Sequence, residues 1–347
     1  MSQTNEKLRV GVAGLNMGMG HLHSYLNNPD VILQALCDQD EAWLNHVCET
    51  AAPQKRYTRF EDMIRDPELD AISLCLPTSL HASGTIAALE AGKHVLCEKP
   101  MATCLADALA MKDAAERTGK KLMISHQQRF GKDIQAMKEK VDTGFFGDIY
   151  FIRIAWRRPQ GLIPSPVSKR ETGIYNRNWF NERANGGGVL RDLGTHLIDL
   201  SLFLSDFPAL SSASGRLYRN FYPEGYDPAL YTVDAEDHAN ALLKFENGMS
   251  VQLEVNFAAH LEEEVVLTEL YGTKGGVSRR NGEVRFFETS GNLTTTTRLQ
   301  NYTGIVKTSQ EHFVQAVLQN TKVPITPAQG AEVVRILDAI YRDGWSN

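Results

Sequence analysis

The sequence lacks a long apolar segment, an excess of positive charge and a signal-like beginning. No stretch approaches the roughly 20 consecutive apolar residues that a membrane-spanning helix needs. Lys and Arg number 36 against 42 Asp and Glu, and the resulting net charge of −6 argues against a general nucleic-acid surface. The first residues, MSQTNEKLRVGVAG, contain no apolar core of a secretion signal. We therefore expect a cytoplasmic protein with neither a membrane nor a nucleic acid as its partner.

Cysteine is also scarce, and its spacing offers no metal-binding or disulfide pattern. The chain has five cysteines, an odd number, and none of them forms a CxxC pair. Buried free thiols in a reducing compartment account for them better than disulfides or zinc, and we expect no metal site. The five positions are Cys37, Cys48, Cys75, Cys97 and Cys104.

A chain of 347 residues is long for one hydrophobic core, and its pattern of apolar and polar residues changes near residue 126. Before that point, uniformly apolar runs such as DAISLCLP alternate with helical patterns, which predicts a parallel sheet with crossover helices. Beyond it, DIYFIRIAWRR alternates apolar and polar residues, and Asn247-Gly248 joins two alternating runs as a hairpin turn does. We predict a nucleotide-binding α/β domain over residues 1–125 and a substrate-binding, mainly antiparallel domain over residues 126–347.

The turn after the first predicted strand, GVAGLNMGMGH, partly matches the G-x-G-x-x-G turn that binds a dinucleotide. Gly14 fits its first position, and Asn16 replaces the second glycine. Met17 and Gly18 follow, with one extra residue before Gly20. Glycines in such a turn let the backbone approach a pyrophosphate closely. An ordinary turn between a strand and a helix is the alternative.

Asp38 ends the second predicted strand, 24 residues beyond Gly14. A carboxylate at this place can accept hydrogen bonds from the adenosine ribose, although it could also cap the following helix. The combination of strand, glycine turn and spacing favours the ribose role. Because the carboxylate would repel a 2′-phosphate and Gln39 adds no positive charge, we predict NAD as the cofactor in preference to NADP.

Two further strand ends carry candidate polar residues. LCLPTSLH ends its strand at Pro77, at the carboxyl edge where ligands of parallel sheets bind. Thr78 could bond the cofactor or cap a helix, and His81 could contact the cofactor or lie on the surface. HVLCEKP ends in Glu98 and Lys99, which either form an ordinary polar turn or bring a lysine to an active site.

The segment GGGVLRDLGTHLIDL places two polar residues on a predicted helix with many leucines. Asp192 and His196 are four residues apart, a spacing that puts both on one face. A chelated metal is the alternative, but no HExxH motif or cysteine cluster accompanies them. Oxidation of an alcohol needs a base for the hydroxyl proton and a cation or donor for the alkoxide. His196 suits the first role and Lys99 the second, while Asp192 can hold a sugar hydroxyl and orient His196.

Together these motifs resemble the glucose–fructose oxidoreductase, inositol dehydrogenase and rhizopine-catabolism (Gfo/Idh/MocA) family. The resemblance covers nearly the whole chain and is carried by GVAGLNMGMGHLH, DAISLCLPTSLHASGTIAALEAGKHVLCEKPMA, HQQRFG and GGGVLRDLGTHLIDL. It departs most in the glycine turn. It implies an α/β fold in which a doubly wound Rossmann sheet precedes an α+β domain with a large, open, mainly antiparallel sheet.

The resemblance also implies roles for single residues. Lys99 is implied to be catalytic, with Pro100 often in the cis form. His196 is implied to be the acid/base, and Asp192 its substrate-orienting partner. Arg129, in HQQRFG, resembles a position near the substrate. Positions that contact the cofactor in the family are matched by Gly14, Asp38, Pro77, Thr78, His81 and Glu98.

The substrate is predicted as a class: a sugar, a glycoside or a cyclitol. The polar and aromatic segment before the second motif holds the candidate contacts Arg158 and Tyr175. We expect an NAD-dependent oxidoreductase that moves a hydride between a secondary hydroxyl and nicotinamide. An NAD-dependent glycosidase acting through transient oxidation and a non-catalytic sensor of sugar or dinucleotide are the alternatives. Because the family often assembles through its open sheet, a homodimer or homotetramer is also expected.

Overall fold

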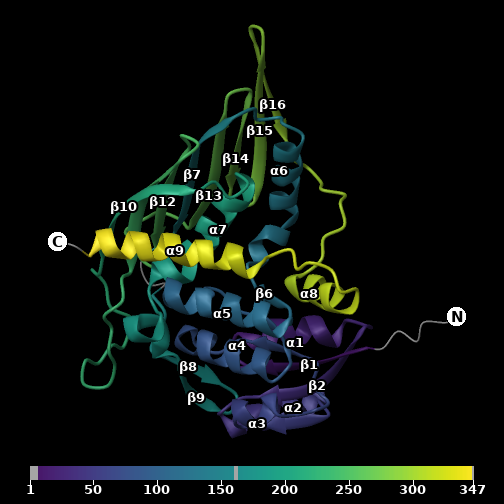
Figure 1. Ribbon diagram of the computed structural model, residues 1–347. Coiled ribbons are helices and arrows are strands. Elements are labelled where there is room, and N and C mark those ends of the chain that lie inside the picture. Colours follow the sequence, from purple (N-terminus) through teal and green to yellow (C-terminus); the bar gives the residue numbers. More distant parts are fainter. Residues whose placement is uncertain (1–6, 160–162, 346–347) are drawn as a thin grey trace, which may run out of the picture. The chain divides into compact units, whose positions relative to one another are not determined.

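The computed structural model describes residues 7–159 and 163–345, which divide into two compact units (Figure 1). The first unit holds the chain up to His126 together with Lys169–Ile174 and Lys307–Val334, and the second unit holds the remainder. The division into two domains at residues 1–125 and 126–347 remains a prediction. The compact units differ from it by drawing two later segments into the first unit.

The first unit is built on a parallel sheet of six strands in the order β3-β2-β1-β4-β5-β6. This is the strand order of a Rossmann fold, with its switch point between β1 and β4, and it confirms the predicted doubly wound sheet. β4 is buried along its whole length, which explains its mainly apolar sequence. The strands are β1 (Leu8–Ala13), β2 (Val31–Cys37), β3 (Lys55–Tyr57), β4 (Ala71–Leu74), β5 (His94–Cys97) and β6 (Leu122–Ile124).

Helices connect these strands, and their ends follow local sequence signals. α5 ends at Gly119, whose left-handed φ of +66° is typical of a glycine that stops a helix. α8 begins with a capping box in which Thr308 and Glu311 bond each other's backbone N–H groups. The helices of this unit are α1 (Gly18–Leu26), α2 (Glu41–Ala51), α3 (Phe60–Ile64), α4 (His81–Glu90), α5 (Leu105–Thr118) and α8 (Ser309–Leu318).

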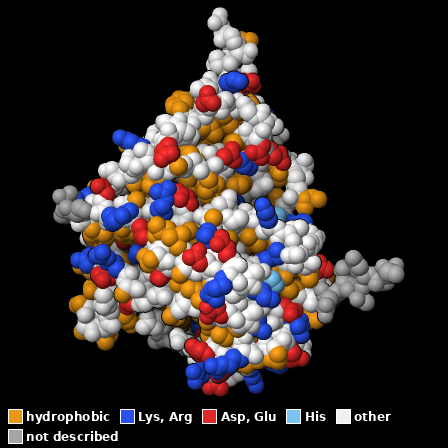
Figure 2. All heavy atoms as spheres, in the orientation of Figure 1, with side chains coloured by type: hydrophobic (Ala, Val, Ile, Leu, Met, Phe, Trp, Pro, Cys, Tyr) orange, Lys and Arg blue, Asp and Glu red, His pale blue; other side chains and the backbone are white. Residues whose placement is uncertain are grey.

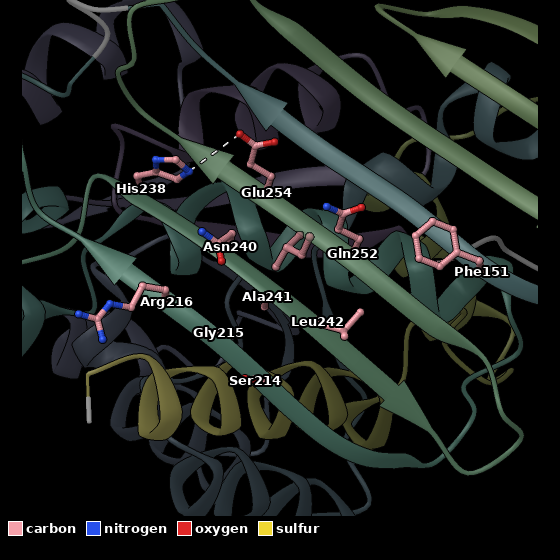
Figure 3. A pocket seen from close by; sticks show the side chains of 11 residues that line it. Phe151, Ser214, Gly215, Arg216, His238, Asn240, Ala241, Leu242, Gln252 and Glu254 are labelled. Carbon is pink, nitrogen blue, oxygen red and sulfur yellow. Dashed lines mark ion pairs between the residues drawn. The ribbon is translucent and has the colours of Figure 1, made fainter. Parts of the chain in front are cut away.

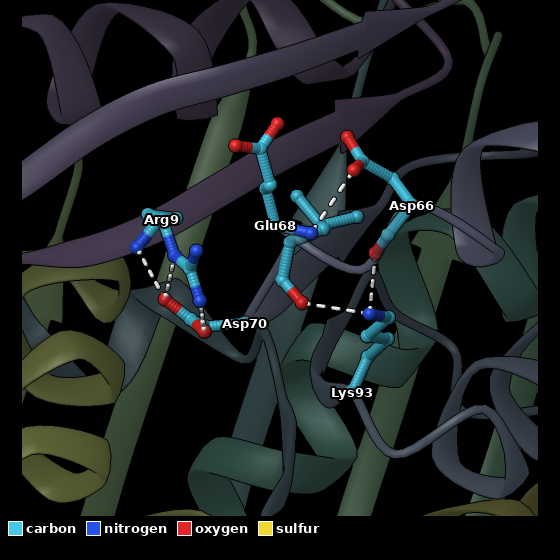
Figure 4. A network of polar contacts seen from close by, with 6 residues as sticks. Arg9, Asp66, Glu68, Asp70 and Lys93 are labelled. Carbon is cyan, nitrogen blue, oxygen red and sulfur yellow. Dashed lines mark hydrogen bonds and ion pairs between the residues drawn. The ribbon is translucent and has the colours of Figure 1, made fainter.

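A polar network holds the amino-terminal edge of this sheet (Figure 4). Arg9 in β1 donates from Nε and Nη2 to the two carboxylate oxygens of Asp70, at 2.9 and 2.7 Å. The ammonium of Lys93 donates to the carbonyl oxygens of Asp66 and Leu69, at 2.6 and 2.8 Å. Ligands of such sheets bind at the opposite, carboxyl edge, so we attribute this network to fold stability.

The second unit contains an eight-stranded sheet in the order β10-β11-β12-β7-β13-β14-β15-β16 (Figure 1). β7 and β12 pair in parallel and the other neighbours are antiparallel, which confirms the predicted mainly antiparallel sheet. Every second residue of β11 is buried, as a sheet with one covered face requires. The strands are β7 (Ile149–Arg157), β10 (Leu210–Tyr218), β11 (His238–Phe245), β12 (Ser250–Asn256), β13 (Val265–Gly272), β14 (Gly275–Arg280), β15 (Glu283–Ser290) and β16 (Leu293–Arg298).

Two Asn-Gly pairs turn the chain between neighbouring strands of this sheet. Gly248 has a φ of +85° in the turn that joins β11 to β12, and the predicted hairpin is confirmed. Between β14 and β15, Asn281 and Gly282 both have positive φ, at +48° and +85°. Two consecutive positive φ angles characterise the tight hairpin turns that match the twist of the strands.

The remaining elements include the helix that carries the second sequence motif. α7 (Thr195–Leu204) follows one π turn at Leu190–Gly194 and packs against β7 and β12. The others are α6 (Lys132–Asp142), the two-stranded sheet of β8 (Val167–Arg170) and β9 (Gly173–Asn176), and α9 (Pro327–Gly344). α9 contributes residues to both units.

The surface carries both signs of charge. On the face in Figure 2, Lys and Arg side chains are interspersed with Asp and Glu. All five cysteines are free, and Cys37, Cys75 and Cys97 are buried. Over residues 7–159 and 163–345, no helix has the length and apolar character needed to cross a membrane. Within the same residues, no three or more His, Cys, Asp and Glu side chains form a group able to hold a metal ion.

Candidate cofactor and active sites

The glycine turn joins β1 to α1, and close packing requires two of its glycines. Gly14 has a φ of +86°, and a Cβ there would overlap the carbonyl oxygen of Cys75, just after β4. A Cβ on Gly18 would collide with the side chain of Val12, whereas one on Gly20 would meet nothing within 4 Å. Gly14 and Gly18 therefore hold the turn against the sheet, and the third glycine has no such role.

The start of α1 suits an anion. Asn16 and Met17 are exposed, and α1 begins without a side-chain cap or an acidic residue in its first turn. The unpaired N–H groups at the start of a helix attract negative charge. Together with the close backbone approach at Gly14, these features fit the pyrophosphate of a dinucleotide.

Asp38 anchors the glycine turn and does not cap a helix. Its Oδ2 accepts a hydrogen bond from the backbone N–H of Leu15 at 2.8 Å, and its Oδ1 accepts one from that of Asp40 at 3.0 Å. The cap of α2 is Asp40, whose Oδ1 accepts from the N–H of Trp43 at 3.0 Å. The capping alternative for Asp38 is therefore wrong. Its carboxylate lies at the end of β2, where Rossmann folds bind a ribose.

A buried histidine braces the loop after β4. His81 Nδ1 lies 2.8 Å from the carbonyl oxygen of Pro100, and its Nε2 lies 2.8 Å from that of Leu76. Burial lowers the pKa of His81. The surface alternative is wrong, and the engagement of both ring nitrogens favours a bracing role over cofactor contact. Pro77 and Thr78 lie at the carboxyl edge, and no side chain caps α4, so the capping alternative for Thr78 is also wrong.

Glu98 belongs to a buried chain of hydrogen bonds at the end of β5. Its Oε1 lies 2.8 Å from Nε2 of His21, whose Nδ1 lies 2.9 Å from Oγ of Ser73. Burial acts to raise the pKa of Glu98, but the hydrogen bond and charge of His21 lower it to about 2. Its Oε2 accepts the backbone N–H of Lys99 at 3.2 Å, and the Lys99–Pro100 peptide is cis. Glu98 is thus an ionised, fixed acceptor beside Lys99, which an ordinary polar turn does not require.

The second motif forms the start of a buried helix. Asp192 lies half-buried within the π turn, and His196 lies in the first turn of α7 with 7% of its surface exposed. π turns occur frequently at functional sites. The flanking leucines are buried, as predicted: Leu190, Leu193, Leu197 and Leu200.

Trp156, which the sequence did not single out, lies beside His196. The rings of Trp156 and His196 have centroids 6.3 Å apart. Trp156 Nε1 and Arg158 Nε both donate to Oε1 of Glu264, at 2.6 and 3.1 Å. Arg158, a predicted substrate contact, is therefore close to Trp156 but already paired. The sequence signal that could have pointed to Trp156 was a tryptophan in a strand predicted to be half-exposed.

Arg129, another predicted substrate contact, is enclosed in the second unit. Its side chain is 2% exposed, and its Nε and Nη2 donate to the two carboxylate oxygens of Asp199 at 2.8 and 2.5 Å. The rings of Phe203 and Phe207 lie 5.2 and 5.0 Å from the guanidinium carbon. This bidentate pair favours a structural role for Arg129 over substrate contact. Tyr175, the third predicted contact, lies partly exposed in β9.

Comparison with known proteins gives two family matches that cover most of the chain. The family described as "Oxidoreductase family, NAD-binding Rossmann fold" matches residues 8–126, and the Gfo/Idh/MocA C-terminal domain matches residues 134–278. D-glucoside 3-dehydrogenase of Escherichia coli (strain K12) is 29% identical over 288 residues, which span 80% of this chain and 78% of that protein. Myo-inositol 2-dehydrogenase of Thermotoga maritima is 30% identical over 198 residues, which span 57% of this chain and 54% of that protein.

Solved structures share the fold over almost the entire chain. Levoglucosan dehydrogenase in complex with NADH and levoglucosan superposes with a TM-score of 0.84 at 22% identity, covering 97% of both chains. Aldose–aldose oxidoreductase from Caulobacter crescentus, complexed with glycerol, superposes with a TM-score of 0.80 at 23% identity, again covering 97% of both chains. At these identities the likeness shows the fold.

Proposed function

Because the chain belongs to the Gfo/Idh/MocA oxidoreductase family, we propose that it is an NAD-dependent dehydrogenase of sugars, glycosides or cyclitols that oxidises a secondary hydroxyl. Its first unit is an NAD-binding Rossmann domain. Relatives named D-glucoside 3-dehydrogenase and myo-inositol 2-dehydrogenase support the substrate class. The observation that carries the proposal is the presence of Lys99, Asp192 and His196 at the positions where the family resemblance implies catalytic residues.

In this proposal His196 exchanges the proton of the reacting hydroxyl, and Lys99 stabilises negative charge on its oxygen. Asp192 orients the substrate and His196. NAD, when bound, supplies the acceptor for the hydride. The packing of His196 beside Trp156 supports its role, because a general base must be held in a fixed orientation. Arg158 and Tyr175 remain proposed substrate contacts, whereas Arg129 is assigned to structure.

The proposed cofactor contacts come from the ends of four strands of the first unit, β1, β2, β4 and β5. The bonded position of Asp38 beside the glycine turn supports a ribose contact, and the absence of a positive charge at Gln39 supports a preference for NAD. His81 is proposed to act indirectly, by bracing the loop of Pro100. The proposed contacts are Gly14, Asn16, Met17, Gly18, Asp38, Pro77, Thr78, Glu98 and Lys99.

Assembly into a homodimer or homotetramer through the exposed face of the eight-stranded sheet is part of the proposal. A hollow of about 640 Å³ is lined by residues of β10, β11, β12 and β7. Figure 3 shows the side chains that line it. It is lined by polar and apolar side chains, among them Leu242, and His238 lies 3.9 Å from Glu254 there. Alongside it, Phe151 and Tyr271 pack with ring centroids 5.4 Å apart. This mixture of aromatic and polar groups suits an interface between copies of the chain.

A screen of sugars, glycosides and cyclitols with NAD, followed by the absorbance of the reduced cofactor, tests this function. The panel includes D-glucosides, levoglucosan and myo-inositol, because relatives carry those names. We expect reduced cofactor to form with at least one compound of this class. Release of an aglycone without net reduction of NAD would instead identify a glycosidase. Binding without turnover across the panel would identify a sensor.

A further inference from the structure

The helix that carries Asp192 and His196 has no cap from its own first residues. A distant segment meets its first N–H groups instead. The backbone N–H of Val189 donates to the carbonyl oxygen of Glu236 at 3.1 Å, and the N–H of Leu190 donates to Oε1 of the same residue at 3.0 Å. Glu236 lies two residues before β11. A single residue 46 positions along the chain from Leu190 therefore caps this helix with both its backbone and its side chain.

The glycine triplet before the helix makes room for this cap. Gly188 has a φ of +109°, and a Cβ at this position would collide with both carboxyl oxygens of Glu236. A Cβ on Gly187 would collide with the carbonyl groups of Trp179 and Phe180. Gly188 thus lets the carboxyl group of Glu236 lie directly against the backbone that enters the helix, and Gly187 lets that backbone pass close to Trp179 and Phe180.

The carboxyl group of Glu236 is enclosed and held from the other side as well. It is 1% exposed, and the hydroxyl of Tyr341 in α9 donates to Oε1 at 2.7 Å. The guanidinium of Arg191, on the π turn itself, stacks 4.3 Å from the ring of Tyr341. Oε2 has no hydrogen-bond partner among the described residues. Burial raises the pKa of Glu236. A buried acid is costly to retain, so its retention here calls for a reason beyond packing.

We propose that Glu236, supported by Tyr341, is a positioning residue that fixes the π turn and thereby the orientation of Asp192 and His196. The inference rests on the proposed function, because only there does His196 act on a substrate. A π turn is rare and has wider spacing than an α turn. In this protein, contacts from Glu236 meet the N–H groups at its start. Without the anchor, the turn would relax toward α-helical spacing and rotate Asp192 relative to His196. Misplacement of a reacting group by about 1 Å can cost roughly 10² in rate.

The test compares variants that keep or remove the anchoring oxygen. Glu236→Gln retains an oxygen for the N–H of Leu190 and the hydroxyl of Tyr341, whereas Glu236→Ala removes it. With the full chain and the substrate found in the screen, we expect kcat to fall by roughly 10- to 100-fold in Glu236→Ala and to stay within about threefold in Glu236→Gln. The dissociation constant for NAD should not change in either variant. Glu246→Ala, which alters an exposed glutamate in the turn after β11, is the matched control.

Two results would overturn the inference. One is a kcat in Glu236→Ala within threefold of the wild type, and the other is an equal loss in the Gln and Ala variants, because the second result would indicate a role for charge. If Glu236→Ala does not fold, the Tyr341→Phe variant tests the inference instead. This variant removes the hydrogen bond to Oε1 of Glu236 and keeps the aromatic ring that stacks on Arg191. A lowered kcat at an unchanged melting temperature supports the inference, and an unchanged kcat overturns it.

A second readout does not depend on knowing the substrate. The imidazole NMR signal of His196, assigned by its loss in His196→Gln, should titrate differently in Glu236→Ala and as in the wild type in Glu236→Gln. An unchanged His196 titration in Glu236→Ala overturns the positioning role. A changed titration in a protein that turns over no sugar, glycoside or cyclitol supports the positioning role and contradicts only the proposed function.

Discussion

His21 Nε2 lies 2.8 Å from Glu98 Oε1, although 77 positions separate the two residues in the chain. The contact continues from His21 to Ser73 Oγ at 2.9 Å, and from there to the hydroxyl of Tyr25 at 2.7 Å. These four side chains connect α1, β4 and the end of β5 in the interior of the first unit. They fix the residue immediately before Lys99, so the position of the proposed catalytic lysine depends on α1.

The first prediction is that Glu98 makes folding stability depend on acid pH. Burial acts to raise its pKa, but the bond to His21 prevails and lowers the pKa from 4.5 to about 2. A carboxyl group whose pKa is lower in the folded state stabilises it above the unfolded pKa and loses that effect as the pH falls through the folded pKa. The contribution, about 3 kcal/mol for such a shift, should be complete above pH 4.5 and lost as the pH falls toward 2.

Chemical denaturation at a series of acid pH values measures this contribution. His21→Leu should destabilise the protein by roughly 3 kcal/mol at neutral pH, because it leaves a buried charge without its partner. His21→Leu should also reduce the loss of stability between pH 4.5 and 2, because His21 then no longer lowers the pKa of Glu98. His23→Leu, at an exposed histidine of the same helix, should behave like the wild type. Identical acid sensitivity of His21→Leu and the wild type would refute the assignment.

The second prediction concerns the proposed catalytic residues. His196→Ala should lower kcat by roughly 10² to 10⁴, because it removes the proposed proton acceptor. It should leave NAD affinity nearly intact, because His196 belongs to the second unit. Lys99→Met removes the charge at similar bulk and should also lower kcat sharply. Asp192→Asn should raise KM. Steady-state kinetics measure these effects, and melting temperatures serve as folding controls. Near-normal turnover in both His196→Ala and Lys99→Met would contradict the mechanism.

The third prediction concerns cofactor choice. The wild type should have a higher kcat/KM with NAD than with NADP, and Asp38→Ala should narrow the difference, because the carboxylate disfavours a 2′-phosphate. Asp40→Ala is a matched control two residues away. It removes the cap of α2 and should cost about 1 kcal/mol of stability without changing the cofactor ratio. A wild-type preference for NADP would show that Asp38 does not select the cofactor.

The fourth prediction separates structure from substrate contact at Arg129. Arg129→Met should destabilise the protein by about 3–5 kcal/mol, because it removes the guanidinium that pairs with the buried carboxylate of Asp199. The double variant Arg129→Met/Asp199→Leu should recover most of that loss, since neither charge of this buried pair then remains. Denaturant titration measures both effects, and KM should stay near the wild-type value. A raised KM at unchanged stability would return Arg129 to the substrate site.

The fifth prediction concerns assembly. Light scattering at micromolar concentration should give the mass of a dimer or tetramer. Leu242→Glu introduces a charge on the exposed face of the eight-stranded sheet and should promote dissociation. Leu318→Glu, at an exposed leucine of α8 in the first unit, should leave the mass unchanged. A monomeric mass for the wild type would rule out the proposed interface.

Local sequence patterns were sufficient to predict much of the fold. The apolar runs at β1 and β4 predicted buried parallel strands, and the pair Asn247-Gly248 predicted a hairpin, because each signal depends on residues adjacent in the chain. The polar residues at strand ends were likewise visible as interruptions of apolar runs. The hydrogen-bond partners of these residues were not visible, since the sequence favoured a ribose contact for Asp38 but left open the helix cap that Asp40 provides.

The sequence by itself determined the two kinds of sheet and the candidate residues Lys99, Asp192 and His196, because periodicity and motif spacing are properties of neighbouring residues. Only the tertiary structure decided which side chains are held by partners far along the chain. It enclosed Arg129 against Asp199, 70 positions away, and brought Glu236 to the glycine triplet. Hydrogen bonds between distant residues depend on how helices and strands pack, and no local pattern of apolar and polar residues encodes that packing.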